Sequence, residues 1–363
     1  MKIAVIFPKD SEALFNIKSS KTFGGASVQL YNIVKALNGI SDVETVSLIS
    51  DCGELSFPDE NKFTIEKTFK VKDNVAVKII KFHKVLKRQK PDVIVQRGLS
   101  LFSCLLSLYC KLLNIKFVFM FAHDNETEGR YQRTGKKCFM FILIIKFTSL
   151  LIVQSENQKN RIKANYKAES VVIRSGYEIK LRENEIKNRK YILWVGRLEP
   201  WKRAELFIKL AEDLKCYKFI MVAPHFRNEN EYSKKINEAV LKHKNLRILP
   251  FVHYHKIRGY FDKALFYVNT SLKEGFPNTF IQSFASGVPV ISLNVDPDNI
   301  LQKHKCGYFC KNDYDIMLKK SLGLLSNKNE YLSMSRKANL YGYKHHNINN
   351  IVMELADIIK GLF

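Results

Sequence analysis

The sequence predicts an α/β protein with two doubly wound parallel-sheet domains, and three observations support this fold class. The chain has 363 residues, a length that favours two domains over one. Short apolar runs alternate twice with longer amphipathic runs, as expected for parallel strands joined by helices that cover both faces of a sheet. A polar segment without periodicity, EIKLRENEIKNRK (178–190), separates the two alternations and is the best linker candidate.

The first alternation predicts buried strands at residues 3–7, 43–50, 92–96, 115–121, 150–154 and 170–174. Helices are expected at about 26–37, 75–89 and 100–113. The most apolar segment, CFMFILIIKFTSLLIV (138–153), is interrupted by Lys146, Thr148 and Ser149, and is shorter than the roughly 20 residues of a spanning helix. We therefore expect a buried helix there that leads into a strand.

The second alternation predicts strands at residues 191–196, 218–223, 246–251, 265–270 and 288–293. We assign residues 1–182 to a first Rossmann-like domain and residues 183–345 to a second one. Residues 346–363 form a C-terminal helix that is expected to pack back toward the first domain. Doubly wound sheets bind ligands outside the carboxyl ends of their strands, so the expected site is a central cleft that both domains face.

The composition limits the classes of partner. A net charge of +24 favours a polyanion. No basic run is interleaved with aromatic residues as in RNA- or DNA-binding motifs, so nucleic acid is not a predicted partner. An anionic membrane surface or a phosphate-bearing substrate fits the charge at least as well. Seven cysteines without regular spacing indicate neither a disulfide framework nor a zinc site, and a cytoplasmic location is expected.

Candidate site residues of the first domain follow its predicted strands. Gly24 and Gly25 directly precede a helix, where paired glycines let backbone N–H groups approach an anion. A flexible loop that needs positive φ explains the same pair. His123 follows the strand at 115–121 and is placed to donate a hydrogen bond to a phosphate or sugar oxygen. A surface histidine in a charged loop is the alternative interpretation.

The second domain carries a pair of cations after its first strand. Arg197 and Lys202 lie in WVGRLEPWKRAE, between this strand and a helix that is expected to start near Pro200. The guanidinium can bind an anion as a planar fork and the ammonium can bind it as a point charge. Two neighbouring cations are not by themselves evidence of a site in so basic a chain. A charge that is only solvated is unusual, however, in a Gly-Arg turn at the end of a buried strand.

The stretch EGFPNTFIQSFASGVPV (274–290) adds a carboxylate and a second helix N-terminus. Glu274 stays in the loop, and Pro277 suits the first helical turn, where its missing N–H has no cost. The N–H groups near Asn278 and Thr279 form an anion-binding nest, and Gln282 lies about one turn into the helix. Cations, two helix N-termini, a histidine and a carboxylate together suit a diphosphate that carries hydroxyl-rich groups, in other words a nucleotide sugar.

The chain resembles the retaining glycosyltransferases of the GT-B fold, of the family 4 type (glycosyl transferases group 1), over nearly its whole length. The resemblance rests on five elements in order: FGGASVQLYNIVKAL, the strand-end His123, LIVQSENQKNRI, WVGRLEPWK and EGFPNTFIQSFASGVPVIS. It implies that the first domain faces the acceptor and that the second binds the nucleotide-sugar donor.

The resemblance also implies roles for individual residues. Those with catalytic roles are His123, Arg197, Lys202 and Glu274, of which the two cations neutralise the leaving diphosphate and Glu274 holds sugar hydroxyls. The implied donor-binding residues are Gly24, Gly25, Val252, Gly275, Phe276, Pro277, Asn278, Thr279 and Gln282. Val252, next to Phe251, marks the region that holds the nucleotide base.

Two departures from the family pattern stand out. Gln282 replaces the second glutamate of the E-x7-E element, so a neutral amide oxygen takes the place of a carboxylate that typically holds the ribose hydroxyls. RSGYE replaces an Asn-Gly turn. Asp296-Pro297-Asp298 fits the D-x-D pattern of metal-dependent transferases, but the resemblance implies no metal and no cofactor, and we interpret the segment as a turn. Asp124, Glu126 and Glu128 are candidates for the general base.

The predicted function is metal-independent, retaining transfer of a sugar to a glycan or lipid-linked glycan in surface polysaccharide biosynthesis. Peripheral association with the inner face of the cell membrane is suggested by basic residues near apolar helices, although a charge run is also typical of a solvated helix face. These residues are Lys78, Lys81, Lys84, Lys87, Arg88, Lys136 and Lys137. The alternatives are a catalytically weak nucleotide-sugar-binding relative or partner subunit, and a GT-B nucleotide-sugar epimerase.

Overall fold

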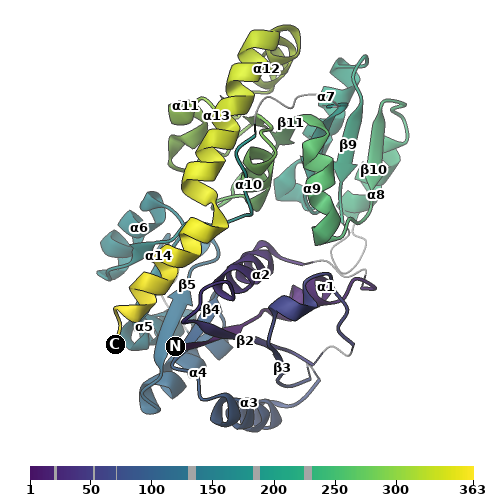
Figure 1. Cartoon of the computed structure of the whole chain (residues 1–363). Coiled ribbons are helices and arrows are strands. Elements are labelled where there is room, and N and C mark those ends of the chain that lie inside the picture. Colours follow the sequence, from purple (N-terminus) through teal and green to yellow (C-terminus); the bar gives the residue numbers. More distant parts are fainter. Residues whose placement is uncertain (20–22, 52–53, 71, 130–135, 183–188, 225–230) are drawn as a thin grey trace. The chain divides into compact units, whose positions relative to one another are not determined.

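The computed structural model describes residues 1–19, 23–51, 54–70, 72–129, 136–182, 189–224 and 231–363 (Figure 1). Contacts divide the chain into two compact units. The N-terminal unit contains residues 1–19, 23–176 and 348–363, and the C-terminal unit contains residues 177–347. The predicted boundary lies after residue 182, next to residues 183–188, which lie outside the described residues. The contacts set it between Gly176 and Tyr177.

The N-terminal unit contains a seven-stranded parallel sheet with the order β3-β2-β1-β4-β5-β6-β7. Its strands are β1 (Lys2–Ile6), β2 (Glu44–Ile49), β3 (Ile65–Lys67), β4 (Val93–Arg97), β5 (Lys116–Met120), β6 (Leu150–Val153) and β7 (Val171–Val172). The central strands are apolar and buried because helices cover both faces of the sheet.

The helices of this unit fall into two layers. They are α1 (Glu12–Phe15), α2 (Gly25–Leu37), α3 (Val75–Gln89), α4 (Leu101–Leu112), α5 (Lys136–Phe147), α6 (Glu156–Tyr166) and α14 (Ile348–Lys360). The chain steps one way along the sheet through α2 and the other way through α3, α4 and α5. Since such crossovers are right-handed, α2 lies on one face and α3 to α5 lie on the other. The C-terminal helix α14 packs against α2.

The C-terminal unit contains a six-stranded parallel sheet with the order β10-β9-β8-β11-β12-β13. Its strands are β8 (Tyr191–Val195), β9 (Phe219–Val222), β10 (Leu246–Leu249), β11 (Ala264–Asn269), β12 (Val290–Ser292) and β13 (Gly307–Phe309). Its helices are α7 (Ala204–Asp213), α8 (Glu231–Val240), α9 (Tyr254–Asp262), α10 (Asn278–Ala285), α11 (Ile300–His304), α12 (Tyr314–Ser326) and α13 (Lys328–His346). This strand order is that of a dinucleotide-binding Rossmann sheet.

These two sheets confirm the predicted fold class of two Rossmann-like parallel-sheet domains. The predicted strands are present within one or two residues at most ends, whereas β3 and β13 were not predicted. The expectation of a buried helix that leads into a strand in residues 138–153 holds for only one side of the helix, where Phe141 and Ile144 are buried. This segment does hold α5 and β6, but Phe139 and Ile142 on α5 are 63% and 52% exposed. Among the described residues, no helix combines the length and apolarity needed to cross a membrane.

Candidate functional site

The candidate site of the C-terminal unit lies at the topological switch point of its sheet. β8 and β11 are neighbours, and the chain continues from β8 to β9 on one side and from β11 to β12 on the other. The loops after these two strands therefore diverge at the carboxyl edge, where doubly wound sheets bind their ligands. One loop carries Arg197 and Lys202, and the other carries Glu274.

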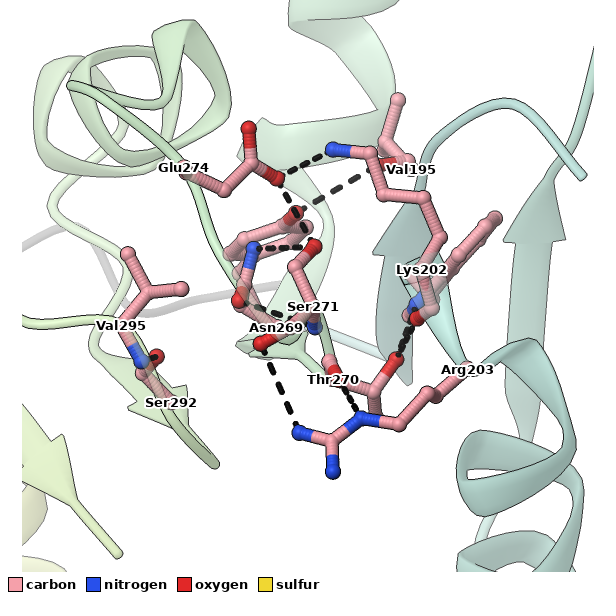
Figure 2. A network of polar contacts seen from close by, with 11 residues as sticks. Val195, Lys202, Arg203, Asn269, Thr270, Ser271, Glu274, Ser292 and Val295 are labelled. Carbon is pink, nitrogen blue, oxygen red and sulfur yellow. Dashed lines mark hydrogen bonds and ion pairs between the residues drawn. The ribbon is translucent and has the colours of Figure 1, made fainter. Parts of the chain in front are cut away.

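Lys202 and Glu274 form an ion pair between these two loops (Figure 2). Lys202 Nζ contacts Glu274 Oε1, and the two side chains are only 15% and 14% exposed. The ammonium group also lies over the Trp201 indole, 4.3 Å from the ring centroid. The structure thus brings together two residues that the sequence placed in the same site through separate motifs.

Three polar side chains hold this ion pair in place (Figure 2). Ser271 Oγ donates to Glu274 Oε1 at 2.8 Å, and Thr270 Oγ1 donates to the carbonyl oxygen of Lys202 at 2.6 Å. Trp194 Nε1, buried on β8, donates to Thr270 Oγ1 at 3.0 Å. Groups at the end of β11 therefore fix the positions of both charged residues.

Arg203 connects the same two loops next to Lys202. Its φ of 51° lies in the left-handed region, which is uncommon for a residue other than glycine. Its Nε donates to the carbonyl oxygen of Thr270 at 2.7 Å, and its Nη1 donates to Asn312 Oδ1 at 2.6 Å. Burial lowers the pKa of Arg203, although Glu205 opposes this shift. These bonds hold the unusual backbone conformation in place and fix the start of α7.

The N-terminus of α10 follows the loop that carries Glu274. Pro277 is the N-cap, one position before the first helical turn predicted for it, and Asn278 and Thr279 are the first two helical residues. The first N–H groups of a helix attract anions because they lack partners within the helix. The phenol of Tyr267 on β11 donates to the carbonyl oxygen of Val195 at 3.3 Å, and burial raises its pKa, an effect that Thr279 opposes. The first turn of α10 thus lies beside the end of β11.

Three other predicted donor-binding residues differ in how accessible they are. Gln282 lies on α10 and is only 8% exposed. Phe276 is buried, with its ring centroid 4.7 Å from that of His346. The Phe276 side chain is thus part of the packing, so a ligand can reach only its backbone or that of Gly275, which is half-buried.

The loop predicted to hold the base follows β10. Val252 is half-buried there, between Phe251 and His253, whose rings meet edge to face with centroids 4.8 Å apart. Burial lowers the pKa of His253, and Lys256 lowers it further. The loop therefore offers a flat ring and a neutral imidazole, two groups that suit a nucleotide base.

In the N-terminal unit, Gly24 and Gly25 begin α2 after the first strand. Gly24 is the N-cap with φ −91°, so the alternative of a loop that needs positive φ is wrong at this position. A Cβ there would lie 2.7 Å from Asp10 Oδ2, and Ser27 Oγ donates to Asp10 Oδ1 at 2.6 Å. Asp10 was not among the predicted residues. Its carboxylate lies next to the helix N-terminus for which the resemblance predicts diphosphate contacts.

His123 lies after β5 on a loop that a buried carboxylate stabilises. Glu126 accepts hydrogen bonds from the backbone N–H groups of Leu99 and Ala122 at 2.8 and 2.7 Å. It also accepts one from the N–H of His123 at 3.3 Å, while the His123 side chain is exposed. Burial lowers the pKa of Arg97 to about 10, although Glu126 opposes this shift. Glu126 therefore has a structural role, and we remove it from the candidates for the general base.

Asp124 and Glu128 remain candidates, but both are paired. Arg161 Nη1 lies 3.5 Å from Asp124 Oδ2 and 3.6 Å from Glu128 Oε1. Gln158 Nε2 also donates to Asp124 Oδ1 at 2.8 Å. Both carboxylates therefore lie beside the Arg161 guanidinium, and Asp124 is also held by an amide.

The Asp296-Pro297-Asp298 segment lies in a 3-10 turn, Pro297–Asn299, before α11. Asp296 Oδ1 accepts a hydrogen bond from the N–H of Leu301 at 2.8 Å, and burial raises the pKa of this carboxyl. Asp296 thus binds the backbone at the start of α11. Within the described ranges, no group of three or more His, Cys, Asp or Glu side chains is arranged to hold a metal ion.

Several residues near the candidate positions were not predicted. They are Asp10 in the N-terminal unit, and Trp194, Arg203, Tyr267, Thr270 and Ser271 in the C-terminal unit. The triplet Asn269-Thr270-Ser271 carried a usable signal, because three polar residues directly end an apolar strand beside Glu274. Asp10 carried no such signal, since its contact with Gly24 joins residues 14 positions apart in a loop.

Comparison with known sequences relates the C-terminal unit to a family. Residues 177–342, nearly all of the C-terminal unit, match the family model described as glycosyl transferases group 1. An uncharacterized glycosyltransferase of Haemophilus influenzae is 24% identical to this chain over 277 residues. The aligned part covers 74% of this chain and 75% of that protein.

Two solved structures share the fold over nearly the whole chain. HepE of Anabaena, solved in complex with UDP-glucose, has a TM-score of 0.77 and 14% identity, with 99% of this chain and 100% of that chain covered. Sucrose-phosphate synthase of Thermosynechococcus elongatus has a TM-score of 0.78 and 14% identity, with 100% and 99% covered. Both similarities agree with the two Rossmann-like sheets.

Proposed function

We propose that this chain, whose C-terminal unit matches the family model of glycosyl transferases group 1, is a glycosyltransferase of that family with the GT-B fold. It moves a sugar from a nucleotide-sugar donor to a glycan or lipid-linked glycan acceptor, with retention of anomeric configuration and without a metal ion. The similarity to HepE, which was solved with UDP-glucose, makes UDP-sugars the first donor class to test.

The ion pair between Lys202 and Glu274 is the observation that carries this proposal. A nucleotide sugar presents a diphosphate next to hydroxyl groups, and these are the partners that an ammonium and a carboxylate each prefer. Donor binding replaces the ion pair, because diphosphate oxygens accept from Lys202 Nζ and sugar hydroxyls donate to Glu274. The supporting bonds of Ser271 and Thr270 keep both groups aimed at the donor.

The chemical step needs stabilisation of the leaving diphosphate. Fixed cations and a helix N-terminus aimed at the developing charge supply this without reorganisation. Arg197, Lys202 and the first turn of α10 are the groups of the C-terminal unit that are suited to this task. The anomeric configuration is retained when the acceptor hydroxyl attacks the sugar from the same face from which the leaving group departs. We assign no side chain as general base.

The cellular role that we propose is a step in surface polysaccharide biosynthesis, carried out in the cytoplasm at the inner face of the cell membrane. A lipid-linked acceptor would lie at that membrane. The net charge of +24 supports a location beside anionic lipid headgroups.

A donor screen tests the proposed reaction. UDP-, GDP- and ADP-sugars are compared by thermal shift, and one class is expected to raise the Tm because it binds the folded state alone. The donor that gives the largest shift is then assayed for hydrolysis and transfer with and without EDTA, and EDTA is expected to leave the rate unchanged. Absence of a shift with every nucleotide sugar would contradict the proposal.

The same assays separate the two alternatives. A binding protein would show the thermal shift without release of nucleotide. An epimerase would convert the donor sugar in the absence of any acceptor, whereas a transferase needs an acceptor or water. If nucleotide is released but no solvent proton exchanges into the donor sugar, the epimerase is excluded.

Reversion of Gln282 to glutamate is expected to change affinity for the donor more than turnover. A carboxylate would accept a charge-assisted hydrogen bond from ribose hydroxyls in place of a neutral one. This difference is worth roughly 1 kcal/mol, so KM for the donor should fall by about fivefold. Gln282→Ala is the matched variant and should raise KM while kcat stays within about twofold. A fall in kcat with unchanged KM in Gln282→Glu would show that this residue acts on the reacting sugar instead.

A further inference from the structure

The outer surface of α3, α4 and α5 is unusually apolar for a protein surface. Nine of the 19 large hydrophobic side chains that are exposed among the described residues lie on these helices or at the end of α4. They are Ile79, Ile80, Leu101, Leu105, Leu108, Leu112, Leu113, Phe139 and Ile142. Single exposed apolar side chains are ordinary, but a contiguous group of them marks an interaction surface.

The exposed leucines of α4 form a stripe along one side of the helix. Leu101, Leu105, Leu108 and Leu112 are spaced by four, three and four residues, which is the repeat of one helical face. The other side of α4 is buried against the sheet through Leu106 and Cys110. The helix is therefore apolar on the side that the fold leaves open as well as on the side that the fold buries.

The three helices form a single layer. Phe82 of α3, Leu106 of α4 and Phe141 of α5 belong to one core cluster with Phe117 and Phe119, which point to the same face of β5. His83 Nδ1 also lies 2.6 Å from the hydroxyl of Tyr109, which joins α3 to α4 directly. The apolar side chains that point away from this core therefore lie on one outer surface.

This layer is also strongly cationic. α3, α4 and α5 contain five, one and three Lys or Arg residues, respectively, and no Asp or Glu. Lys84, Lys87, Lys111 and Lys146 are exposed. Lys81 and Arg88 are paired with Asp73 and Glu66 outside the helices, and the side chains of Lys136 and Lys137 lie outside the described residues.

We propose that the outer face of α3, α4 and α5 docks on an anionic lipid membrane. The leucine stripe and the exposed side chains of α5 enter the boundary between headgroups and acyl chains, and the surrounding lysines bind the anionic headgroups. This inference deepens the proposed function, because it rests on a membrane-bound acceptor and identifies the surface that brings the enzyme to it.

Charge favours a membrane over a second copy of this chain as the occupant. A symmetric dimer through this surface would bring the lysines of both copies together, and like charges across an interface are repulsive. An anionic bilayer satisfies the apolar and the cationic parts of the surface at the same time. Lysines also suit a bilayer because their long stems can lie along apolar surface while the ammonium group stays hydrated.

Sedimentation with lipid vesicles tests the inference, and the assay contains no nucleotide sugar. The full chain is expected to bind vesicles that contain phosphatidylglycerol, to bind pure phosphatidylcholine much more weakly, and to lose part of its binding at about 1 M salt. Leu105→Gln/Leu112→Gln is expected to lower partitioning at least tenfold, since two apolar side chains no longer enter the bilayer. Lys84→Gln/Lys87→Gln should lower it by about tenfold or more on anionic vesicles only.

The matched control is Leu241→Gln, because Leu241 is 85% exposed in the C-terminal unit and should not affect binding. If the double leucine variant fails to fold, Leu112→Gln alone, at a side chain that is 78% exposed, serves instead. The inference is overturned if the wild type does not bind anionic vesicles, or if the leucine variants bind them as well as Leu241→Gln does. It is also overturned if the leucine substitutions only convert a dimer of this chain to a monomer. If the chain binds anionic vesicles but no nucleotide sugar shifts its Tm, the proposed function is rejected and the membrane-docking surface is not.

Discussion

Replacement of Lys202 by methionine is expected to lower kcat/KM for sugar transfer by about 10²–10³-fold. Methionine keeps much of the apolar stem but removes the charge that Lys202 Nζ holds beside Glu274 at the carboxyl edge of the sheet. A preorganised group that stabilises a leaving anion contributes about 3–4 kcal/mol, and most of that appears in kcat. Steady-state kinetics with the donor found by the screen measure the effect.

The control for this variant is Lys215→Met, which removes an exposed lysine of the same unit and should leave the kinetics unchanged. Donor binding by Lys202→Met should weaken less than kcat/KM, because the diphosphate gains charge only as the glycosidic bond breaks. If Lys202→Met loses affinity for the donor and keeps kcat, the lysine only binds the ground state and our assignment is incorrect.

Local sequence patterns were sufficient to predict the architecture, and they pointed to Lys202 and Glu274, which the structure pairs. Parallel strands buried on both faces are apolar runs, and Arg197, Lys202 and Glu274 directly follow such runs at positions where solvated charges are unusual. The three-residue strands β3 and β13 could not be predicted this way, because neither lies in a run of aliphatic residues such as those that contain the similarly short β7 and β12.

The supporting groups depend on contacts between distant positions. Arg203 bonds to Thr270 and Asn312, which lie 67 and 109 positions further along the chain. No local pattern separates it from the other basic residues, and its left-handed backbone conformation is also invisible in the sequence. The exposure of α5 was missed for a related reason, because an apolar run does not reveal whether neighbouring elements cover both sides of the helix.

Replacement of Glu274 by glutamine is expected to lower kcat/KM by about 10²-fold. Glutamine has nearly the same shape, but it accepts neutral hydrogen bonds from the sugar in place of charge-assisted ones. It also leaves Lys202 largely buried without a full counter-charge, so a loss of stability of about 1–3 kcal/mol is expected. Glu238→Gln, at an exposed glutamate of α8, is the control and should affect neither property.

The double variant Lys202→Met/Glu274→Gln separates a catalytic pair from a structural one. Removal of both buried charges also removes the penalty of leaving one of them unpaired, so the double variant should be more stable than the sum of the single effects predicts. Transfer should not recover, because the diphosphate and the sugar hydroxyls have each lost a charged partner. Chemical denaturation and steady-state kinetics measured on the same four proteins complete this cycle. If transfer recovered together with stability, the ion pair would only hold the two loops in place, and the binding of the donor would have to be assigned to other residues at the switch point.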